Sequence, residues 1–575
     1  MTSAVRVSLF RAALLVLGFT VFACYRPTRR ECAVLCGDGN QCPDGMDCSN
    51  GRCTSHGRQC SRLETDAAPP PVECVPGTTR CASRAAVERC DMDGVTWSQV
   101  QACGDETPVC AAGQCLRCTP GSARCIDETS RAVCDETGNF GEPSRCPAGA
   151  NSCVNAECTP KLQVAAGGAH ACAKLASGRV FCWGENSAGQ LGVGDRLRRR
   201  GDPSDLPLEA VELGSPALSV VTGGAHTCAL LEGGVVKCWG ENAAGQLGQG
   251  DVERRGDEPG EMARLRPVDL GAARTAVSLT AGDRHTCALL DDGTVKCWGA
   301  NESGQLGVSG ARHRGGAPFE LGERLTPLAL DWDTVVVAID AGAAHTCAAL
   351  ADGSVVCWGD NSAGQLGIGA ANGSDGALQS GRLVPRVILG AERRAVGVAA
   401  GADHSCALIE GGSVVCWGNN DAGQLGVGDA VSRGRQPEGI EAELSEVELG
   451  SGAFALAVSA GARHTCVLLA QGAVKCWGSN AFGALGLGRA ELNRGVMPSD
   501  LGDALLTVDL GSRQSGARAV SGLSAGLDFT CAVLEDEAIK CWGLNAHGQL
   551  GLGDSRNRGL SPGELGELLP EVVLE

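Results

Sequence analysis

The chain has 575 residues, with 48 lysine and arginine residues against 67 aspartate and glutamate residues, for a net charge of −19. This acidic balance argues against a general nucleic-acid-binding surface, because such surfaces carry clustered positive charge. Glycine accounts for 84 residues, which is roughly twice its ordinary share and is typical of a protein made of tight turns. We therefore expect no nucleic-acid partner.

Residues 1–23 are predicted to be a signal peptide. A basic segment precedes an apolar run from Ala12 to Ala23, and this run is too short to span a bilayer. The run ends in Val-Phe-Ala-Cys at Cys24, which resembles a bacterial lipobox. Phe22, two residues before the cysteine, is an unusual residue for this motif. Ordinary cleavage after Ala23, without lipidation, is the alternative.

The cysteine count favours lipidation of Cys24. Of the 33 cysteines, 14 pair within the C-terminal repeats and 18 fall into three groups of six, so Cys24 stands alone. A lipidated Cys24 explains the odd cysteine without a free thiol, and more than one acyl chain gives stable membrane attachment. We therefore predict a lipoprotein of the bacterial cell envelope, held at the outer membrane or the cell surface.

Three cysteine-rich modules are predicted before the repeats. Residues 24–60 contain the lipid anchor and the first module, residues 61–73 form a proline-rich linker, and residues 74–115 and 116–160 form the second and third modules. Each module is too short to bury a large core, so disulfides are its natural stabiliser. Six cysteines per module allow 15 pairings, and the sequence leaves this connectivity open.

Residues 161–575 contain one unit repeated seven times, at intervals of 56 to 65 residues. Within one unit, residues 276–281, 285–290 and 295–298 have the composition of short strands, and residues 265–270 supply a fourth. Four short strands repeated seven times predict an all-β fold, a seven-bladed β-propeller with four-stranded blades. Each unit contains a Cys-Trp-Gly triplet, beginning at Cys182, Cys238, Cys297, Cys357, Cys416, Cys476 and Cys541.

Each unit also contains two cysteines ten residues apart. If the intervening turn is centred on Asp292, Cys287 lies directly opposite Cys297. Opposed Cα atoms of antiparallel strands lie roughly 4.5–5.5 Å apart, which a disulfide can span. Reduced, buried thiols are the alternative, and the predicted export favours oxidation. We therefore predict seven disulfides: Cys172–Cys182, Cys228–Cys238, Cys287–Cys297, Cys347–Cys357, Cys406–Cys416, Cys466–Cys476 and Cys531–Cys541.

Two further residues recur in the units. A tryptophan follows each second cysteine, and we expect it to pack between neighbouring blades. A histidine begins the second strand in six units, at His170, His226, His285, His345, His404 and His464. Equivalent positions lie one per blade, too far apart to share a metal ion, and the seventh unit has Phe529 instead. We predict structural histidines, no metal site and no cofactor.

The unit reads Ala-Gly-x-x-His-Thr-Cys-Ala-Leu, Gly-x-Val-x-Cys-Trp-Gly and Asn-x-x-Gly-Gln-Leu-Gly. This pattern resembles the repeat of the regulator of chromosome condensation family over residues 162–575, with local departures at Ala484 and Phe529. The resemblance implies a seven-bladed propeller. That family includes a nucleotide exchange factor on chromatin and secreted bacterial binders such as an inhibitor of β-lactamase, so the resemblance predicts the fold better than the function.

The sequence shows no nucleophile with a base, no phosphate-binding loop and no convergent metal ligands, so we predict no catalytic residue and no enzyme activity. Polar loops of roughly 15–20 residues join the Gly-Gln-Leu-Gly turn to the next Val-x-Leu strand, and they are the candidate binding surface. We interpret the protein as a monomeric, membrane-anchored, extracytoplasmic binding scaffold for an unknown protein, or secondarily for a polysaccharide. The alternatives are a propeller lyase or hydrolase acting on an envelope or extracellular polymer, and an inhibitor of a secreted or periplasmic enzyme.

Two further features concern these loops and the strand segments that follow them. Arg-Gly-Asp occurs at residues 200–202 and 255–257, and we interpret it as chance recurrence within a repeated loop rather than as an integrin-binding motif. The last Val-x-Leu copy lies at residues 572–574, at the end of the chain. It either joins the seventh blade or completes the first, and an unpaired strand edge is avoided in both cases.

Overall fold

The computed structural model describes residues 162–575 apart from 203–204, 273, 331–334, 370–383, 388, 391–392, 436–443, 491–492 and 514–515, and before residue 162 it describes the backbone of short strands. The chain divides into two compact units, Met1–Thr119 and Pro120–Glu575. The predicted signal peptide, the lipidation site Cys24 and the linker at 61–73 lie outside the described residues.

The cysteine-rich part of the chain forms short antiparallel strands. The first unit contains β1 (Val34–Leu35), β2 (Asp47–Ser49), β3 (Arg52–Thr54), β4 (Thr79–Ser83), β5 (Ala86–Cys90), β6 (Trp97–Ala102), β7 (Val109–Ala111) and β8 (Gln114–Leu116). The second unit begins with β9 (Ala123–Asp127), β10 (Ser130–Val133), β11 (Ser144–Arg145), β12 (Ser152–Val154) and β13 (Glu157–Thr159). The backbone register opposes one cysteine pair in each predicted module: Cys48 and Cys53, Cys110 and Cys115, and Cys153 and Cys158.

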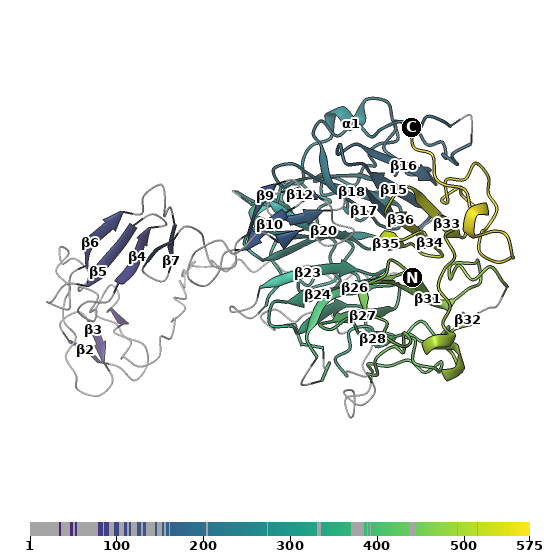
Figure 1. Cartoon of the computed structure of the whole chain (residues 1–575). Helices are drawn as coiled ribbons and strands as arrows, with labels where there is room; N and C mark the ends of the chain where they lie inside the picture. Colours follow the sequence, from purple (N-terminus) through teal and green to yellow (C-terminus); the bar gives the residue numbers. More distant parts are fainter. Residues whose placement is uncertain are drawn as a thin grey trace, which may run out of the picture. The chain divides into compact units, whose positions relative to one another are not determined.

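Seven antiparallel sheets then follow in chain order, one per sequence unit (Figure 1). The first strand of each sheet is the inner one: β14 (Gln163–Ala166), β17 (Ala217–Thr222), β20 (Ala276–Ala281), β23 (Val336–Ala341), β26 (Ala395–Ala400), β29 (Ala455–Ala460) and β35 (Val520–Ala525). The middle strands are β15 (His170–Lys174), β18 (His226–Leu231), β21 (His285–Leu290), β24 (His345–Leu350), β27 (His404–Ile409), β30 (His464–Leu469) and β36 (Phe529–Leu534). The third strands are β16 (Val180–Gly184), β19 (Val235–Gly240), β22 (Val295–Gly299), β25 (Val355–Gly359), β28 (Val414–Gly418), β31 (Val474–Ser479) and β37 (Ile539–Gly543).

The connecting segments contain short helical turns and small strands. These elements are α1 (Glu261–Arg264), η1 (Gly322–Arg324), η2 (Pro498–Asp500), η3 (Gly502–Ala504), η4 (Gly566–Leu568), β32 (Asn493–Arg494), β33 (Ser512–Arg513) and β34 (Gly516–Ala517).

The three strands predicted for the third unit are confirmed to within one residue. In the pairing of β21 with β22, Cys287 lies opposite Cys297, as the turn centred on Asp292 predicted. Every residue of these two strands is buried. Both faces of the sheet therefore pack against neighbouring blades, which explains why the strands are apolar along their length rather than alternating.

The predicted fourth strand is reduced to a single backbone contact in most blades. Within the described residues, six of the seven sheets have three strands, and the sheet of β29, β30 and β31 gains a fourth strand, β32, which precedes the Val-x-Leu segment of that unit. In the second blade, Val268 N donates to Val236 O at 2.8 Å. In this blade Pro267 precedes Val268 and has no N–H to extend the ladder. The prediction of four-stranded blades is not confirmed, because the described sheets are mostly three-stranded.

The equivalent backbone hydrogen bond shows which sheet the last Val-x-Leu segment joins. Val572 N donates to Ile539 O at 2.9 Å, so the last Val-x-Leu segment joins the seventh sheet. The first sheet receives its own copy, because Val211 N donates to Val180 O at 2.8 Å. Each sheet is therefore built from one continuous stretch of chain, and the ring is not closed by a strand exchanged between its two ends.

Seven glycines bring the inner strands together at one end of a central cavity. A Cβ atom on any of them would lie closer than 3.0 Å to the carbonyl oxygen of the next glycine, and the series returns from Gly526 to Gly167. Only glycine permits so close a backbone approach. We call these residues the glycine ring: Gly167, Gly223, Gly282, Gly342, Gly401, Gly461 and Gly526.

The sheets present two ends to solvent. The loop face carries the glycine ring and the Asn-x-x-Gly-Gln-Leu-Gly segments. The turn face carries the hairpin turns, such as residues 291–293, and the first residues of the inner strands, because Ala276 pairs with Leu290 and Ala281 pairs with Thr286. All seven sheets line the cavity between these two faces.

Candidate functional site

The repeated histidines hydrogen-bond each blade to the next. His285 Nε2 lies 2.9 Å from Thr346 Oγ1 in the following blade, and the Thr346 hydroxyl donates to the backbone carbonyl of Gln305 at 3.2 Å. Because the single hydroxyl hydrogen is used in that bond, His285 must donate from Nε2. We call this chain of two bonds the clasp. It occurs at His170–Thr227, His226–Thr286, His285–Thr346, His345–Ser405, His404–Thr465 and His464–Thr530.

The clasp requires neutral histidines. Burial, with added repulsion from His226 and His345, lowers the pKa of His285 to about 3. The other ring nitrogen of His285, Nδ1, is buried without a hydrogen-bond partner among the described residues, so it carries a lone pair rather than a proton. The histidines thus have the structural role that the sequence predicted. No three His, Cys, Asp or Glu side chains in the described part of the chain are grouped to hold a metal ion.

The tryptophans add a second bond to the same carbonyl groups. Trp298 is fully buried, and its Nε1 donates to Gln246 O of the preceding blade at 2.9 Å. The predicted packing of tryptophan between blades is confirmed. This arrangement also explains the departure at Ala484, because the acceptor is a backbone carbonyl that alanine supplies equally. Ala484 O accepts from Trp542 at 2.9 Å and from Thr530 at 3.1 Å.

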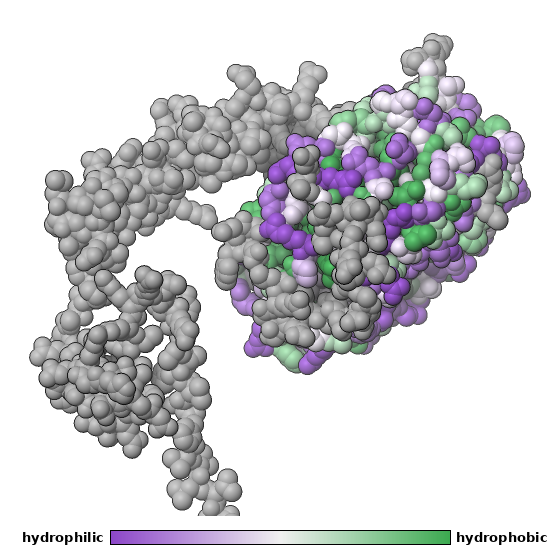
Figure 2. All heavy atoms as spheres, turned by 90° about the horizontal axis from the view of Figure 1, so that it is seen from below, coloured by the Kyte–Doolittle hydropathy of each residue, from purple (hydrophilic) through white to green (hydrophobic). Residues whose placement is uncertain are grey.

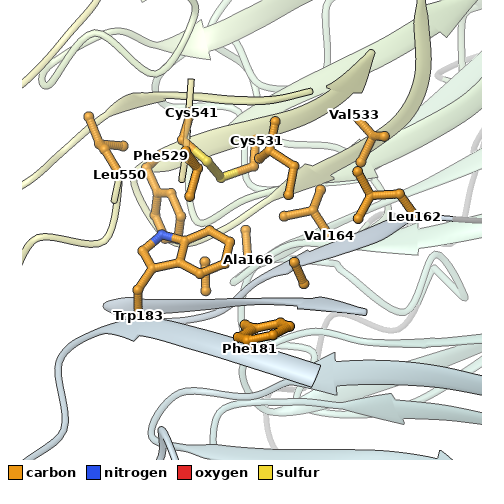
Figure 3. Close-up of a cluster of buried hydrophobic side chains, with 14 of the residues drawn as sticks. Leu162, Val164, Ala166, Phe181, Trp183, Phe529, Cys531, Val533, Cys541 and Leu550 are labelled. Carbon is orange, nitrogen blue, oxygen red and sulfur yellow. A yellow bond between two sulfur atoms is a disulfide. The ribbon is translucent and has the colours of Figure 1, made fainter. Parts of the chain in front are cut away.

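The interface between the seventh and first blades, which we call the seam, has no clasp. The position of the histidine is occupied by Phe529 and the position of its threonine partner by Ala171. Both are fully buried and belong to one apolar cluster with Trp183 and Leu550 (Figure 3). The seam is therefore an apolar contact at the point where the other six interfaces are polar.

All seven predicted cysteine pairs form disulfides in the structure. The S–S distances lie between 2.04 and 2.11 Å, and the paired Cα atoms lie 4.0 to 4.1 Å apart. Each bond links the middle and third strands of one blade and is buried between blades. The disulfides therefore stabilise each blade internally, whereas the clasps connect one blade to the next.

The loop face carries a turn that is held in the same way in four blades. In the second blade, buried Asn242 donates from Nδ2 to Asp251 O at 2.9 Å, and Arg255 pairs with the Asp251 carboxylate at 2.7 Å. The same carboxylate accepts from the backbone N–H of Glu253 at 3.0 Å. Asp251, Asn242 and Arg255 therefore fix the backbone of the turn, and the Glu253 side chain is left exposed.

The exposed residue at the centre of this turn, which we call the tip, differs from blade to blade. The Asp–Arg pair and the bond to the tip N–H recur with nearly constant distances, 2.7 Å and 2.8 to 3.0 Å. The tip side chains are apolar, acidic, apolar and basic in chain order: Leu197, Glu253, Val431 and Arg556. A constant frame thus presents variable side chains at the loop face.

The predicted loops divide between two places rather than clustering on one face. Their first half forms the tips, where Arg255 pairs with Gly240 at the loop-face end of β19. Their second half returns along the outside of the blade to the bond between Val268 and Val236. The sequence indicated the correct segments but could not show this return path, because the path depends on one backbone hydrogen bond.

The Arg-Gly-Asp tripeptide at residues 255–257 is not presented for binding. The Asp257 side chain is nearly fully buried and pairs with Arg196 of the preceding blade. The backbone N–H groups of Gly256 and Asp257 donate to the Glu261 carboxylate at 2.8 and 3.2 Å. The structure therefore agrees with the interpretation of this tripeptide as a recurrence within a repeated loop.

One pair at the loop face was not foreseen from the sequence. His547 Nδ1 lies 2.5 Å from Glu185 Oε2, across the seam. Burial alone would raise the pKa of Glu185, but hydrogen bonds from Ser187 and His547 and the charge of Arg198 lower it. No sequence pattern links residues 362 positions apart, and only closure of the ring brings them together.

Similarity to known proteins agrees with this architecture. Residues 133–515 match the RCC1-like domain and residues 520–549 match the regulator of chromosome condensation repeat. The chain is 30% identical to the ultraviolet-B receptor of Arabidopsis thaliana over 404 residues, which cover 69% of this chain and 80% of the receptor. It is 31% identical to the human E3 ubiquitin-protein ligase HERC2 over 303 residues, which cover 51% of this chain but only 6% of the ligase.

Among solved structures, Prp20p from Saccharomyces cerevisiae, described with its binding to Gsp1p and histones, is similar with a TM-score of 0.51 and 21% identity. The likeness covers 66% of this chain and 84% of Prp20p, and at this level of identity it concerns the fold. No helix in the described residues is both long and apolar enough to cross a membrane.

Proposed function

The chain belongs to the RCC1-like domain family, and from that premise we propose that it is an extracytoplasmic protein-binding scaffold whose seven sheets form a seven-bladed propeller. The single observation that carries the proposal is the set of four tips. Their frame is constant and internally satisfied, while their exposed side chains differ in size and charge. Binding surfaces are typically variable segments on a rigid scaffold.

The structure of the tips favours a protein partner. Leu197 is 67% exposed and Val431 is 63% exposed, and nothing in the repeated frame needs an apolar residue at either position. On the visible described surface of Figure 2, hydrophobic and hydrophilic residues are interspersed. The four tips are apolar, acidic, apolar and basic, so recognition would use several separate side chains of different chemistry. Prp20p provides a precedent, since it is described as binding the proteins Gsp1p and histones. A polysaccharide is the second choice of ligand.

The proposed location follows from the cysteines. Seven disulfides within the blades suit an oxidising compartment outside the cytoplasm. The sequence Val-Phe-Ala-Cys24, after a short apolar run, adds a lipid anchor to the bacterial cell envelope. In the sequence, the cysteine-rich modules lie between the proposed anchor and the repeats. We propose a monomer without enzyme activity or cofactor. The ligase activity of the HERC2 relative gives no guide here, because this chain matches only a small part of that protein.

The test substitutes single tip residues with a photo-reactive amino acid and measures which protein is cross-linked. A photo-reactive amino acid at position 197 or 431 of the full chain, expressed in its own cells, is expected to cross-link the same envelope or secreted protein from both positions. The matched control places the same group at Leu568, which is 71% exposed but lies outside the tips. Identical cross-links from all three positions, or none from the tips, would contradict binding through the tips.

A further inference from the structure

The central cavity is a separate feature that the tips do not use. It has a volume of about 260 Å³ and lies behind the glycine ring, toward the turn face, because the residues that line it precede the glycines in each inner strand. Polar side chains on several inner strands contribute to its wall, including Gln163, Thr280 and Ser459. The cavity is therefore a polar chamber on the axis of the ring.

Asp340 is the one ionisable side chain among the described residues that line this cavity. Thr280 donates its hydroxyl to Asp340 Oδ1 at 3.0 Å, and Ala400 N donates to Oδ2 at 2.8 Å. Both donors are neutral. A carboxylate offers about four acceptor positions, so each oxygen keeps the capacity to accept a further hydrogen bond from the cavity.

Among the described residues, no positively charged side chain pairs with this carboxylate, whereas buried charges are ordinarily paired. The equivalent positions in other blades hold neutral residues: Ala165, Val221, Thr280, Ala399, Ser459 and Ser524. Burial raises the pKa of Asp340 to about 6, so at neutral pH the group is mostly charged. A cation entering the cavity would interact with this charge at a lower effective dielectric than in water, where the attraction is stronger.

The turn-face end of the inner strands adds an apolar collar. In six of the seven inner strands the register shifts at the second residue, as between Ala276 and Ser278 in β20. Such a bulge redirects one side chain out of the ladder. In four blades this residue is apolar and 37% to 53% exposed: Val277, Val337, Val396 and Leu456. These four side chains are partly exposed to water and lie at equivalent positions of the inner strands, at the turn-face end.

We propose that the axis of the ring is a binding site for an alkyl cation, that is, a primary ammonium or guanidinium group on an apolar stem, with its charged head at Asp340 and its stem against the collar. The charged head of such a ligand would lie deeper in the cavity, at Asp340, and its apolar stem would lie nearer the turn face, at the collar. The ligand would enter from the turn face, because the glycine ring narrows the other end. The proposal does not depend on the tips, which lie on the opposite face.

The test titrates the full chain with n-butylammonium and with n-butylguanidinium by isothermal calorimetry at pH 7.5. Binding of at least one of the two is expected, with affinity reduced at least tenfold in Asp340→Asn, which keeps the size of the side chain. Glu232→Gln removes a carboxylate from a hairpin turn of the same face and is expected to bind as the wild type does. Circular dichroism of each variant separates loss of the site from loss of the fold.

Two outcomes would overturn the site: no binding of either cation to the folded wild type at millimolar concentration, or equal binding by folded Asp340→Asn. The neutral n-butanol is expected to bind at least tenfold more weakly than the cations, and equal binding would also overturn the role of Asp340. A second titration, with the blocked peptide Gly-Gly-Lys-Gly-Gly, distinguishes the natural sources. Binding of peptide and free amine supports a lysine side chain of a protein, and binding of the free amine alone supports a small metabolite.

Discussion

The six clasped interfaces and the seam solve the same packing problem with opposite chemistry. At a clasp, a buried imidazole N–H donates to a hydroxyl of the next blade, and that hydroxyl donates to a backbone carbonyl. At the seam, Phe529 and Ala171 fill the same positions with carbon, and no polar atom of either side chain needs a partner. The difference shows that a repeat can exchange a polar pair for an apolar pair when both members change together.

The largest loss of stability is expected from a substitution at Phe529, in the seam. Phe529→Ala would leave a cavity in the apolar cluster of the seam, so the free energy of unfolding is expected to fall by about 3–5 kcal/mol. Urea unfolding of the full chain measures this change. The control, Phe319→Ala, removes a phenylalanine that is 58% exposed and is expected to change stability by less than about 0.5 kcal/mol. Equal effects of the two substitutions would show that the seam is not a packed core.

Removing the hydroxyl of a clasp should also lower the stability of the protein, because a buried donor loses its acceptor. Thr346→Val keeps the shape of the side chain but leaves His285 Nε2–H without an acceptor, so a loss of about 1–3 kcal/mol is expected. The exposed Thr326 provides the control, since Thr326→Val unpairs no buried group. If the Thr346 variant unfolds at the same urea concentration as the Thr326 variant, the clasp contributes nothing to stability.

The clasps should also make the ring sensitive to acid. Burial lowers the pKa of His285 from 6.5 to about 3, so between these values the unfolded chain binds a proton that the folded chain does not. Stability from this group is therefore present above pH 6.5 and is lost as the pH falls below it, by up to about 1.4 kcal/mol per pH unit.

The measurement compares the wild type with His285→Gln at pH 7.5 and pH 5. The stability difference between the two proteins is expected to move in favour of the glutamine variant at pH 5, because glutamine does not titrate. A difference that is the same at both pH values would contradict a neutral, buried His285 in the folded state.

The smallest effect is expected when a clasp is built at the seam. Phe529→His alone places an imidazole N–H beside Ala171, where it has no acceptor, and should destabilise the protein. Adding Ala171→Thr supplies the hydroxyl, and a favourable coupling energy of about 1 kcal/mol is expected between the two substitutions. Thermal unfolding of the two single variants and the double variant gives this coupling, and strict additivity would show that the two positions do not face each other.

Sequence reasoning was strongest where the signal is local and repeated. The strand positions, the opposition of Cys287 and Cys297, and the packing of Trp298 between blades all depend on spacings shorter than one repeat. The seam was missed because Phe529 and Ala171 lie at opposite ends of the ring sequence. Phe529 departs clearly from the repeat, but Ala171 does not, since alanine in place of threonine is a common change in a single strand.

The candidate sites were less predictable than the fold. The tips were placed in the correct loops, but the roles of Asp251 and Arg255 in holding them depend on side-chain contacts. Asp340 gave no signal at all, because one carboxylate in an inner strand becomes distinctive only when seven such strands surround a common axis. The fourth strand was predicted from the Val-x-Leu pattern, but a segment with this pattern can also lie beside a sheet with only one backbone hydrogen bond.

We propose an exported scaffold with oxidised blades, and the intact mass of the protein purified from its own membranes tests this proposal most directly. Alkylation with and without prior reduction counts the free thiols. We expect acyl chains on Cys24 and no alkylation before reduction. An unlipidated mass, together with 14 thiols alkylated without reduction, would contradict it, because the seven blade pairs would then be reduced and the case for an oxidising compartment would be lost.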